Sequence, residues 1–341
     1  MSTSANSQGQ RAGRVVSGMR PTGQLHLGHL VGALSNWTRL QSEHDCFYFV
    51  ADWHALTSDF ADTSKLTGYT YENVADWIGA GLDPEKSTLF VQSLVPEHAE
   101  LYLLLSMVVP VPWLERVPTY KEQQENLTDK DLSSIGFLGY PLLQTADVAI
   151  YDAQLVPVGE DQVAHLELAR EVVRRFNNFF GDALVEPQPL LTTFARLPGL
   201  DGDKKMSKSL GNTIHLSDTA EDVKKKVMKM YTDPKRVRAD VPGTVEGNPV
   251  FTYHDAFNPN KEEVEDLKTR YRLGKVGDVE VKTKLANALN AHLEPIRARR
   301  AAVLAKPNLL KEILFEGSKR ARRVATETMA RVRDAVKINY T

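Results

Sequence analysis

The chain has 341 residues, which is more than one hydrophobic core usually serves, so its length predicts two domains of unequal size. Its 42 basic and 44 acidic side chains nearly cancel, so any nucleic-acid contact must come from a local patch of charge rather than from the field of the whole molecule. The single cysteine, Cys46, excludes a disulfide framework and a cysteine-rich zinc or iron–sulfur site.

The N-terminal residues and the lengths of the apolar runs indicate in which cellular compartment the protein works. Residues 1–12 are polar and lack the apolar segment of a signal peptide, which predicts a disordered tail. No stretch approaches the roughly 20 consecutive apolar residues of a membrane span. We therefore expect a cytoplasmic protein without a membrane partner.

Residues 14–42 predict a strand, a turn and a helix in succession. An apolar run at 15–19 precedes a turn with Pro and Gly, and helical spacing of apolar residues follows. His26 and His29 flank Gly28 where the first free N–H groups of the helix would attract phosphate, and glycine lets a ligand approach the backbone. The pattern indicates a nucleotide site, and the alternative is two histidines satisfied locally or by solvent.

Strands and helices alternate through the first half of the chain. Apolar runs at 46–50 and 87–92 predict buried strands, and helical spacing predicts helices at 63–82 and 96–109. This alternation favours right-handed crossovers and a parallel sheet, with ligands at the carboxyl ends of the strands.

The middle of the chain carries two candidate groups of polar residues. In a mostly apolar helix predicted at 134–151, Tyr140, Gln144 and Asp147 share one face. Burying an acid without a partner is costly, so Asp147 is either a pocket residue or an acid at the rim of the helix. A strand at 155–158 ends in Gly159, and the acids that follow are either a helix cap or ligands of ribose hydroxyls.

A lysine-rich loop separates this part from a helical tail. Residues 187–199 predict a further strand and a turn, and residues 201–209 (DGDKKMSKS) are almost wholly polar. The segment is either an ordinary charged surface loop or a lid whose ammonium groups stabilise a leaving pyrophosphate.

From residue 217 onward the pattern is helical. We expect a cap at Ser217, an irregular connection at 239–260, and helices at 261–272, 282–305 and 317–338. Their basic side chains are compatible with RNA phosphate contacts, although basic helix faces are more often simply solvated. These are Arg297, Arg299, Arg300, Lys319, Arg320, Arg322, Arg323, Arg331 and Arg333.

Two motifs together resemble those of the class I aminoacyl-tRNA synthetases. They are HLGH at residues 26–29 and KMSKS at residues 205–209, in this order, the second just before a helical tail. The segments SGMRPTGQLHLGHLVGAL, QSLVPEHAELYLLLS, WLERVPTYKEQ and VPVGEDQVAHLELAREVVRRFN are similar to the bacterial tryptophanyl-tRNA synthetases.

The resemblance implies both the fold and the reaction. The fold class is α/β: a Rossmann-like parallel-sheet catalytic domain at 13–216 and an all-helical anticodon-binding domain at 217–341, whose end can return to pack on the catalytic domain. The reaction is activation of tryptophan by ATP and transfer to tRNA(Trp), by a homodimer that has no DNA partner. Mg²⁺ is expected to bind through the ATP phosphates and not at a metal site of the protein.

The resemblance also implies the site residues. Lys205, Lys208 and Lys121 are expected to be catalytic, because they would stabilise charge on the phosphates. The residues expected to bind ATP are His26, Gly28, His29, Gly159, Asp161, Gln162, Lys205, Met206, Ser207, Lys208, Ser209 and Arg20. Those expected to bind tryptophan are Asp147, which would accept the indole N–H, with Gln144, Tyr140, Gln162, His54, Val16 and Val158.

The choice of amino acid rests on departures from two related patterns. Tyr140, Gln144 and Asp147 also match the Tyr-x-x-x-Gln-x-x-Asp pattern of tyrosyl-tRNA synthetases, and many tryptophan enzymes carry methionine where Gln144 stands. Against tyrosine, Val16 and Arg20 replace a phenol-contacting Tyr and an amine-binding Asp of the tyrosine enzymes, which would leave tyrosine short of polar partners.

A regulatory or binding protein that has lost aminoacylation is a further alternative. The intact lysines of residues 205–209 and both histidines argue against it, because a pure binder has no need for groups that act on pyrophosphate. Some tryptophan enzymes hold an iron–sulfur cluster through cysteines in a similar tail, which this chain cannot do.

Overall fold

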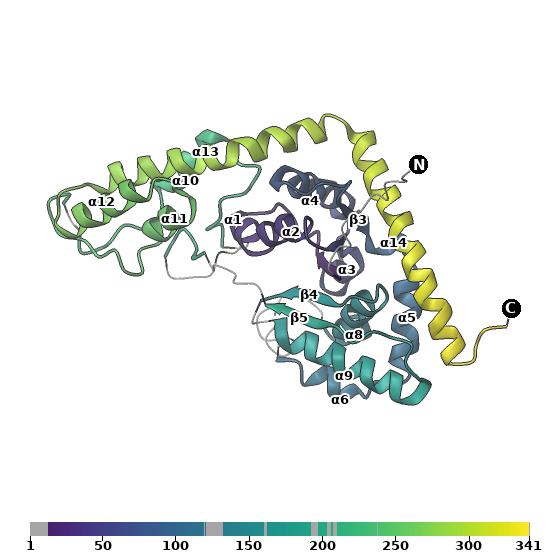
Figure 1. The fold of residues 1–341 in the computed structure, drawn as a ribbon. Helices are drawn as coiled ribbons and strands as arrows, with labels where there is room; N and C mark the ends of the chain where they lie inside the picture. Colours follow the sequence, from purple (N-terminus) through teal and green to yellow (C-terminus); the bar gives the residue numbers. More distant parts are fainter. Residues whose placement is uncertain are drawn as a thin grey trace, which may run out of the picture.

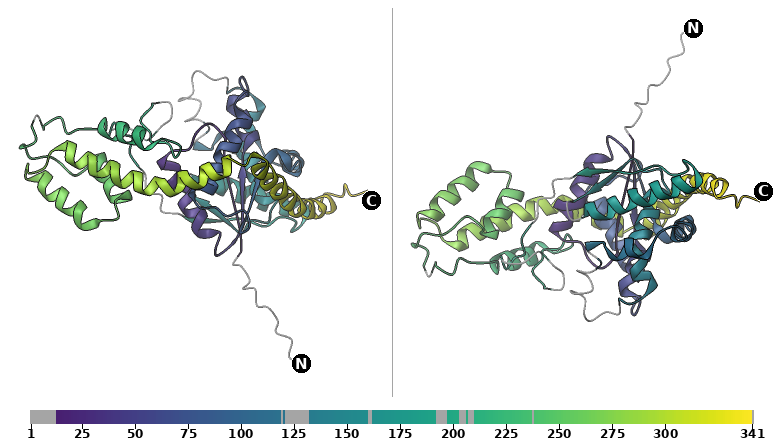
Figure 2. Two further views of the ribbon diagram at one scale, coloured as in Figure 1. Left: turned by 90° about the horizontal axis from the view of Figure 1, so that it is seen from above. Right: turned by 90° about the horizontal axis from the view of Figure 1, so that it is seen from below.

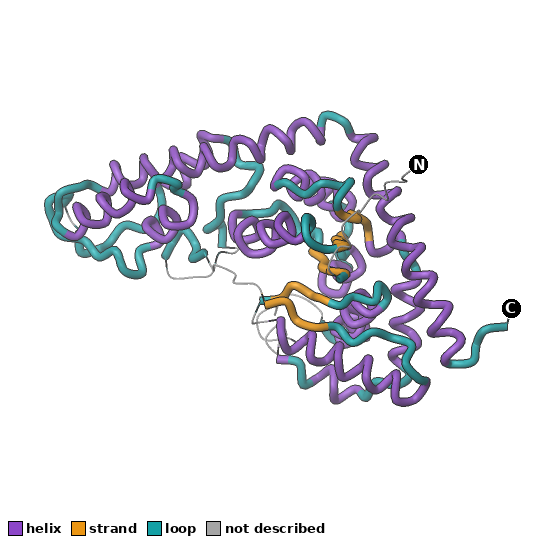
Figure 3. Tube along the Cα trace, in the orientation of Figure 1, coloured by secondary structure: helices purple, strands orange, loops and turns teal. Residues whose placement is uncertain are grey.

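A parallel sheet forms the centre of the protein. The computed structural model describes residues 13–118, 120, 132–159, 162–191, 197–202, 206, 210–236 and 238–340. The strands β1 (Arg14–Met19), β2 (Asp45–Val50), β3 (Ser87–Val91), β4 (Leu155–Val158) and β5 (Gln188–Leu191) pair in the order β3-β2-β1-β4-β5, and every pairing is parallel. The predicted α/β fold is thus confirmed, and the strand order reverses between β1 and β4, where such sheets open a ligand crevice (Figures 1 and 3).

Helices cover both faces of the sheet. The first turn of helix α1 (Leu27–His29) runs into a π-helical turn, η1 (Leu30–Leu34), and then into α2 (Ser35–Leu40). The others in this part are α3 (Asp52–Asp59), α4 (Leu66–Ala80), the short 3-10 turn η2 (Gln92–Leu94), α5 (Glu97–Ser106), α6 (Val111–Glu115), α8 (Ile135–Ala149) and α9 (Val163–Phe180).

Two apolar cores lie on opposite faces of the sheet. Successive strand residues face opposite sides, so Val15 joins one core and Val16 the other. The first core contains side chains of α1, α2, α4 and the helical tail, and the second contains side chains of α5, α8, α9 and the later turns of α14, the last helix of that tail. Strands β2 and β3 are buried on both faces, which explains why they read as continuous apolar runs.

The helical tail consists of α10 (Ala220–Met228), α11 (Pro249–Phe257), α12 (Lys261–Arg272), α13 (Asp278–Leu304) and α14 (Pro307–Ala335). Helix α13 packs against α10 and α11 at one end and against α4 of the sheet part at the other. Helix α14 then lies along β3 and α5, so the end of the chain returns to the sheet (Figures 1 and 2). In the described part of the chain, no helix is both long and apolar enough to cross a membrane.

Two local predictions for the tail were wrong. Thr219 caps α10 instead of Ser217, because Ser217 lies inside a turn that the N–H of Asp218 closes by donating to the carbonyl of His215. The stretch expected to be an irregular connection contains α11. Its proline stands at the first helical position, where no N–H is needed, and Asn248 caps the helix by accepting the N–H of Val250.

The basic residues of α13 and α14 mostly bond to the sheet part. Arg300 pairs with Asp76, Arg322 with Glu97 and Arg333 with Glu100. Arg331 pairs with Asp152, and Arg299 and Arg320 donate to backbone carbonyls. These six arginines connect the two helices to the sheet part, and contact of the basic side chains with RNA stays a prediction.

The joint between α4 and α13 includes a buried acid. Asp76 is fully buried, and Arg300 Nε donates to its Oδ1 over 2.6 Å. Burial raises the pKa of Asp76 to about 6, although the charge of Arg300 opposes this rise.

We expect Asp76 to make the stability of the protein depend on pH. Between pH 3.8 and about 6 the folded chain retains a proton that the unfolded chain has lost, so the free energy of unfolding falls as pH rises and levels off above pH 6. The shift corresponds to about 2–3 kcal/mol. Urea unfolding of the wild type and of Asp76→Asn across pH 4–7 measures it, and a difference between them that stays constant with pH would contradict the assignment.

We expect Gly317→Ala to destabilise the protein. A Cβ at Gly317 would overlap the backbone carbonyl of Leu89 in β3, and neither the strand nor α14 can give way cheaply. The expected loss is about 1–3 kcal/mol. Gly68→Ala is the matched control, because Gly68 is exposed on α4 with nothing nearby, and alanine there should stabilise by about 0.5–1 kcal/mol. Equal melting temperatures for the two variants would refute the close packing of α14.

Candidate active site

A cavity of about 360 Å³ lies at the carboxyl ends of β1 and β4, where the strand order reverses. Its volume falls in the range of small-ligand pockets, roughly 300–1,000 Å³. The walls come from β1, β4, α3, α8 and the start of α9. They are lined by Val16, Ser17, Gly18, Arg20, Phe49, Ala51, His54, Thr57, Tyr140, Gln144, Asp147, Val148, Val156, Pro157, Val158, Gln162 and His165.

All seven residues predicted for the amino acid line this cavity. Tyr140, Gln144 and Asp147 share one face of α8, as their spacing predicted. The other four are His54, Val16, Val158 and Gln162. Arg20, predicted for ATP, lies in the same cavity, and its Nη1 donates to Ser58 Oγ over 3.3 Å.

Asp147 is held in the wall of the cavity by several hydrogen bonds. Only 1% of it is exposed, and its carboxylate accepts three hydrogen bonds from side chains. His54 Nε2 lies 2.7 Å from Oδ2, while Gln92 Nε2 at 2.7 Å and His98 Nδ1 at 2.6 Å bond to Oδ1. Burial alone would raise the pKa of Asp147, but His54 and His98 lower it to about 2, so the group is ionised at neutral pH.

Three buried residues of this network were missed by the sequence reasoning: Gln92, His98 and Tyr151. Gln92 stands at the carboxyl end of β3, which is the edge where ligands bind, and this position could have identified it. His98 lies near the start of α5 and Tyr151 just beyond α8, and the only signal for either is a polar residue in an apolar segment.

The histidines predicted for the nucleotide stand at the start of α1 and cap it. His26 Nδ1 accepts the N–H of Gly28 over 3.1 Å, and His29 Nδ1 accepts the N–H of His26 over 3.2 Å. Because each Nδ1 accepts, the neutral imidazoles carry their hydrogen on Nε2. Both rings therefore carry their hydrogen on Nε2, a group that can donate to a phosphate oxygen.

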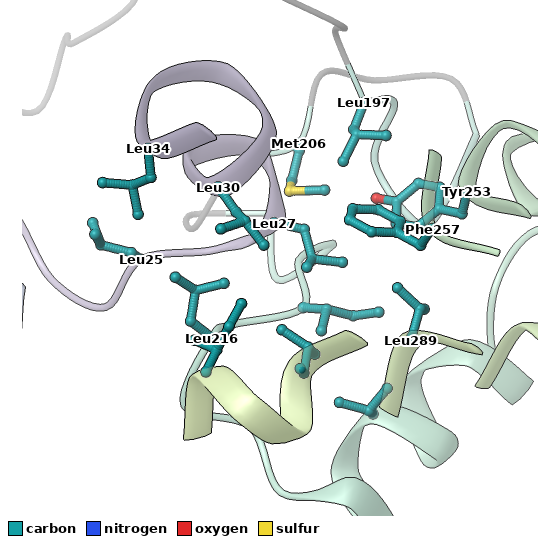
Figure 4. Packing of buried hydrophobic residues seen from close by; sticks show 14 of the residues in the cluster. Leu25, Leu27, Leu30, Leu34, Leu197, Met206, Leu216, Tyr253, Phe257 and Leu289 are labelled. Carbon is teal, nitrogen blue, oxygen red and sulfur yellow. The ribbon is translucent and has the colours of Figure 1, made fainter. Parts of the chain in front are cut away.

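Met206 joins the lysine-rich segment to this helix. It is 6% exposed and belongs to the same core as Leu27 and Leu30, beside which Figure 4 shows its side chain. A Cβ at Gly28 would lie 2.9 Å from the ring of His26, too close for an ordinary contact, and 3.4 Å from the sulfur of Met206, so glycine accommodates the capping ring of His26.

The chain beyond Met206 is also fastened to the segment before α1. The N–H of Leu27 donates to the carbonyl of Ile214 over 3.0 Å, and that of Leu216 donates to Leu25 over 2.9 Å. The chain that follows the second motif therefore pairs with the backbone around the first motif.

Several predicted residues fall outside the part that the structure describes. These are Lys121, Asp161, Lys205, Ser207, Lys208 and Ser209. Gly159 is described and is buried just after β4.

Comparisons with known proteins agree with this geometry. The family model described as tRNA synthetases class I (W and Y) matches residues 8–294. The chain is 51% identical over 325 residues to the tryptophan–tRNA ligase of Treponema pallidum, covering 95% of this chain and 96% of that protein. It is 49% identical over 328 residues to the tryptophan–tRNA ligase of Thermotoga maritima, covering 96% and 100%.

A solved structure has the same fold. It is the tryptophanyl-tRNA synthetase from Campylobacter jejuni complexed with ADP and tryptophan, with a TM-score of 0.86 and 33% identity, covering 95% of this chain and 99% of that one. The chain belongs to the class I tRNA synthetases for tryptophan and tyrosine, which confirms the family predicted from the two motifs.

Proposed function

We propose that this chain activates tryptophan with ATP to form tryptophanyl-adenylate and then transfers the tryptophanyl group to tRNA(Trp). The observation that carries the proposal is a cavity with many apolar side chains in its walls and a buried, ionised carboxylate at Asp147. Such a site fits a large aromatic ring that bears a single N–H donor, because the ring buries apolar surface and its one polar group finds an acceptor.

The activation step is a displacement at phosphorus. An oxygen of the tryptophan carboxylate attacks the α-phosphorus of ATP, and the bond to the β-phosphate oxygen breaks to release pyrophosphate. A ribose hydroxyl of the tRNA 3′ end then attacks the carbonyl carbon, and AMP leaves. The protein contributes positioning and stabilisation of charge rather than covalent chemistry.

We assign the nucleotide to the start of α1 and the lysine-rich segment. His26 and His29 would donate from Nε2 to phosphate oxygens, with Gly28 allowing close approach. Lys205 and Lys208 would bind the β- and γ-phosphates, with help from Lys121. Mg²⁺ would enter with the ATP phosphates, whose oxygens it prefers together with water. Gly159, Asp161 and Gln162 would hold the ribose and the neighbouring amino acid.

Tryptophan is favoured over tyrosine by two other residues that line the cavity of Asp147. Val16 is fully buried and offers no hydrogen bond to a phenol, and Arg20 brings a cation where an amine-binding acid would stand in a tyrosine enzyme. The two curated relatives named above are both tryptophan–tRNA ligases. The tyrosine alternative and that of a non-catalytic binding protein are therefore not favoured.

We assign anticodon binding to the helical tail at 217–341, whose end packs on the sheet part, and we place the reaction in the cytoplasm. Exposed apolar side chains on neighbouring helices support a homodimer: Leu103 and Met107 on α5, Val111 on α6 and Ile135 on α8. A contact between two copies would remove this apolar surface from water.

Pyrophosphate exchange tests the proposed function. The purified protein should exchange labelled pyrophosphate into ATP with tryptophan and not with tyrosine, and it should charge tRNA(Trp). Exchange with tyrosine alone would favour the tyrosine enzyme. Failure to charge tRNA with either amino acid would sink the proposal of an aminoacylating enzyme.

Asp147→Ala should weaken tryptophan binding by about 1–3 kcal/mol, because the ring N–H would be buried without an acceptor. Affinity for ATP should change little. Titration calorimetry with each ligand measures both, and the melting temperature reports the cost of leaving three side-chain donors without their acceptor. An unchanged tryptophan dissociation constant would remove Asp147 from the ligand contact.

A further inference from the structure

Two residues bond to Asp147 from behind the cavity. Gln92 and His98 are fully buried, and neither is among the residues that line the cavity. Both donate to Oδ1, whereas His54, which does line the cavity, bonds to Oδ2. A carboxylate oxygen has about two acceptor directions, so Oδ1 is saturated and Oδ2 retains one.

The two donors are themselves oriented by further hydrogen bonds. The side-chain oxygen of Gln92 accepts the N–H of Trp53 over 3.2 Å, so the amide NH₂ must face Asp147. Nδ1 of His98 must carry a hydrogen, because an ionised carboxylate only accepts. Its Nε2 lies 2.6 Å from the phenol oxygen of Tyr151, whose pKa is raised by burial, so that group keeps its proton and can donate.

This arrangement matters for recognition because it leaves one open acceptor direction. Without bonds to Oδ1, the carboxylate could rotate and offer either oxygen to donors of other shapes. With Oδ1 occupied, the remaining direction belongs to the oxygen on the side of His54 and the cavity. Preorganised polar groups of this kind discriminate strongly, because they need no rearrangement when the ligand binds.

We propose that Gln92 and His98 are positioning residues for selection of the ring N–H, and that Tyr151 holds His98 in the required tautomer. They act through Asp147 and do not touch the substrate. This inference rests on the proposed function, since it takes the ligand of Asp147 to be the indole ring.

The test compares tryptophan with an analogue in which sulfur replaces the ring N–H. The variant His98→Phe/Tyr151→Phe removes the hydrogen bonds from His98 to Asp147 and between His98 and Tyr151. It keeps aromatic rings at both positions, so little core volume is lost. Its affinity for tryptophan should fall about tenfold, and its affinity for the analogue should stay almost unchanged. In His98→Asn/Tyr151→Phe the amide can donate in place of Nδ1, so the preference for tryptophan should return.

The controls separate positioning from packing. Phe90→Leu alters a ring that packs against His98 and Tyr151 without touching the hydrogen bonds, so any loss should be equal for both ligands. Gln92→Leu is an independent variant should the first one fail to fold, and the same selective loss is expected. Equal losses for both ligands, or no loss, in the variants that remove the hydrogen bonds would overturn the inference.

Asp147→Ala distinguishes this inference from the proposed function on which it rests. If Asp147→Ala abolishes the preference for tryptophan while the other variants retain it, only the positioning role fails. If Asp147→Ala leaves the preference intact, the contact of Asp147 with the ring fails and the positioning role fails with it.

Discussion

An ionised carboxylate buried beside a ligand cavity is the constraint on which much of the structure depends. Asp147 is tolerated there because His54, Gln92 and His98 bring donors from α3, the end of β3 and α5 to one point on α8. An unpaired buried charge would cost more than most single contacts return. The hydrogen bonds that offset the free-energy cost of burying Asp147 therefore also set the relative positions of four elements that surround the cavity.

The last helix extends this organisation across the molecule. Helix α14 lies along β3, and its Arg322 pairs with the buried Glu97 at the start of α5. The next residue, His98, donates to Asp147. One turn of α5 thus faces the C-terminal helix on one side and the cavity network on the other. After forming the rest of the helical tail, the chain returns to the sheet part as α14. This helix packs against α5, which carries one of the donors to Asp147.

The described residue of the second motif packs against the first motif. Met206, the one described residue between 203 and 209, is buried against Leu27 and Leu30. The histidines use their Nδ1 atoms to cap the helix, which leaves Nε2–H as the donor form. The capping that starts the helix also selects the tautomer suited to phosphate.

The sequence alone determined the features that depend on local spacing. Apolar runs located the strands, helical spacing placed Tyr140, Gln144 and Asp147 on one face, and two motifs identified the family. Only the tertiary structure decided which distant side chains share a hydrogen bond. Gln92, His98 and Tyr151 carry no periodic signal, because their role depends on how β3, α5 and α8 approach one another. For the same reason the sequence did not show that three arginines of α14 face carboxylates of the sheet part.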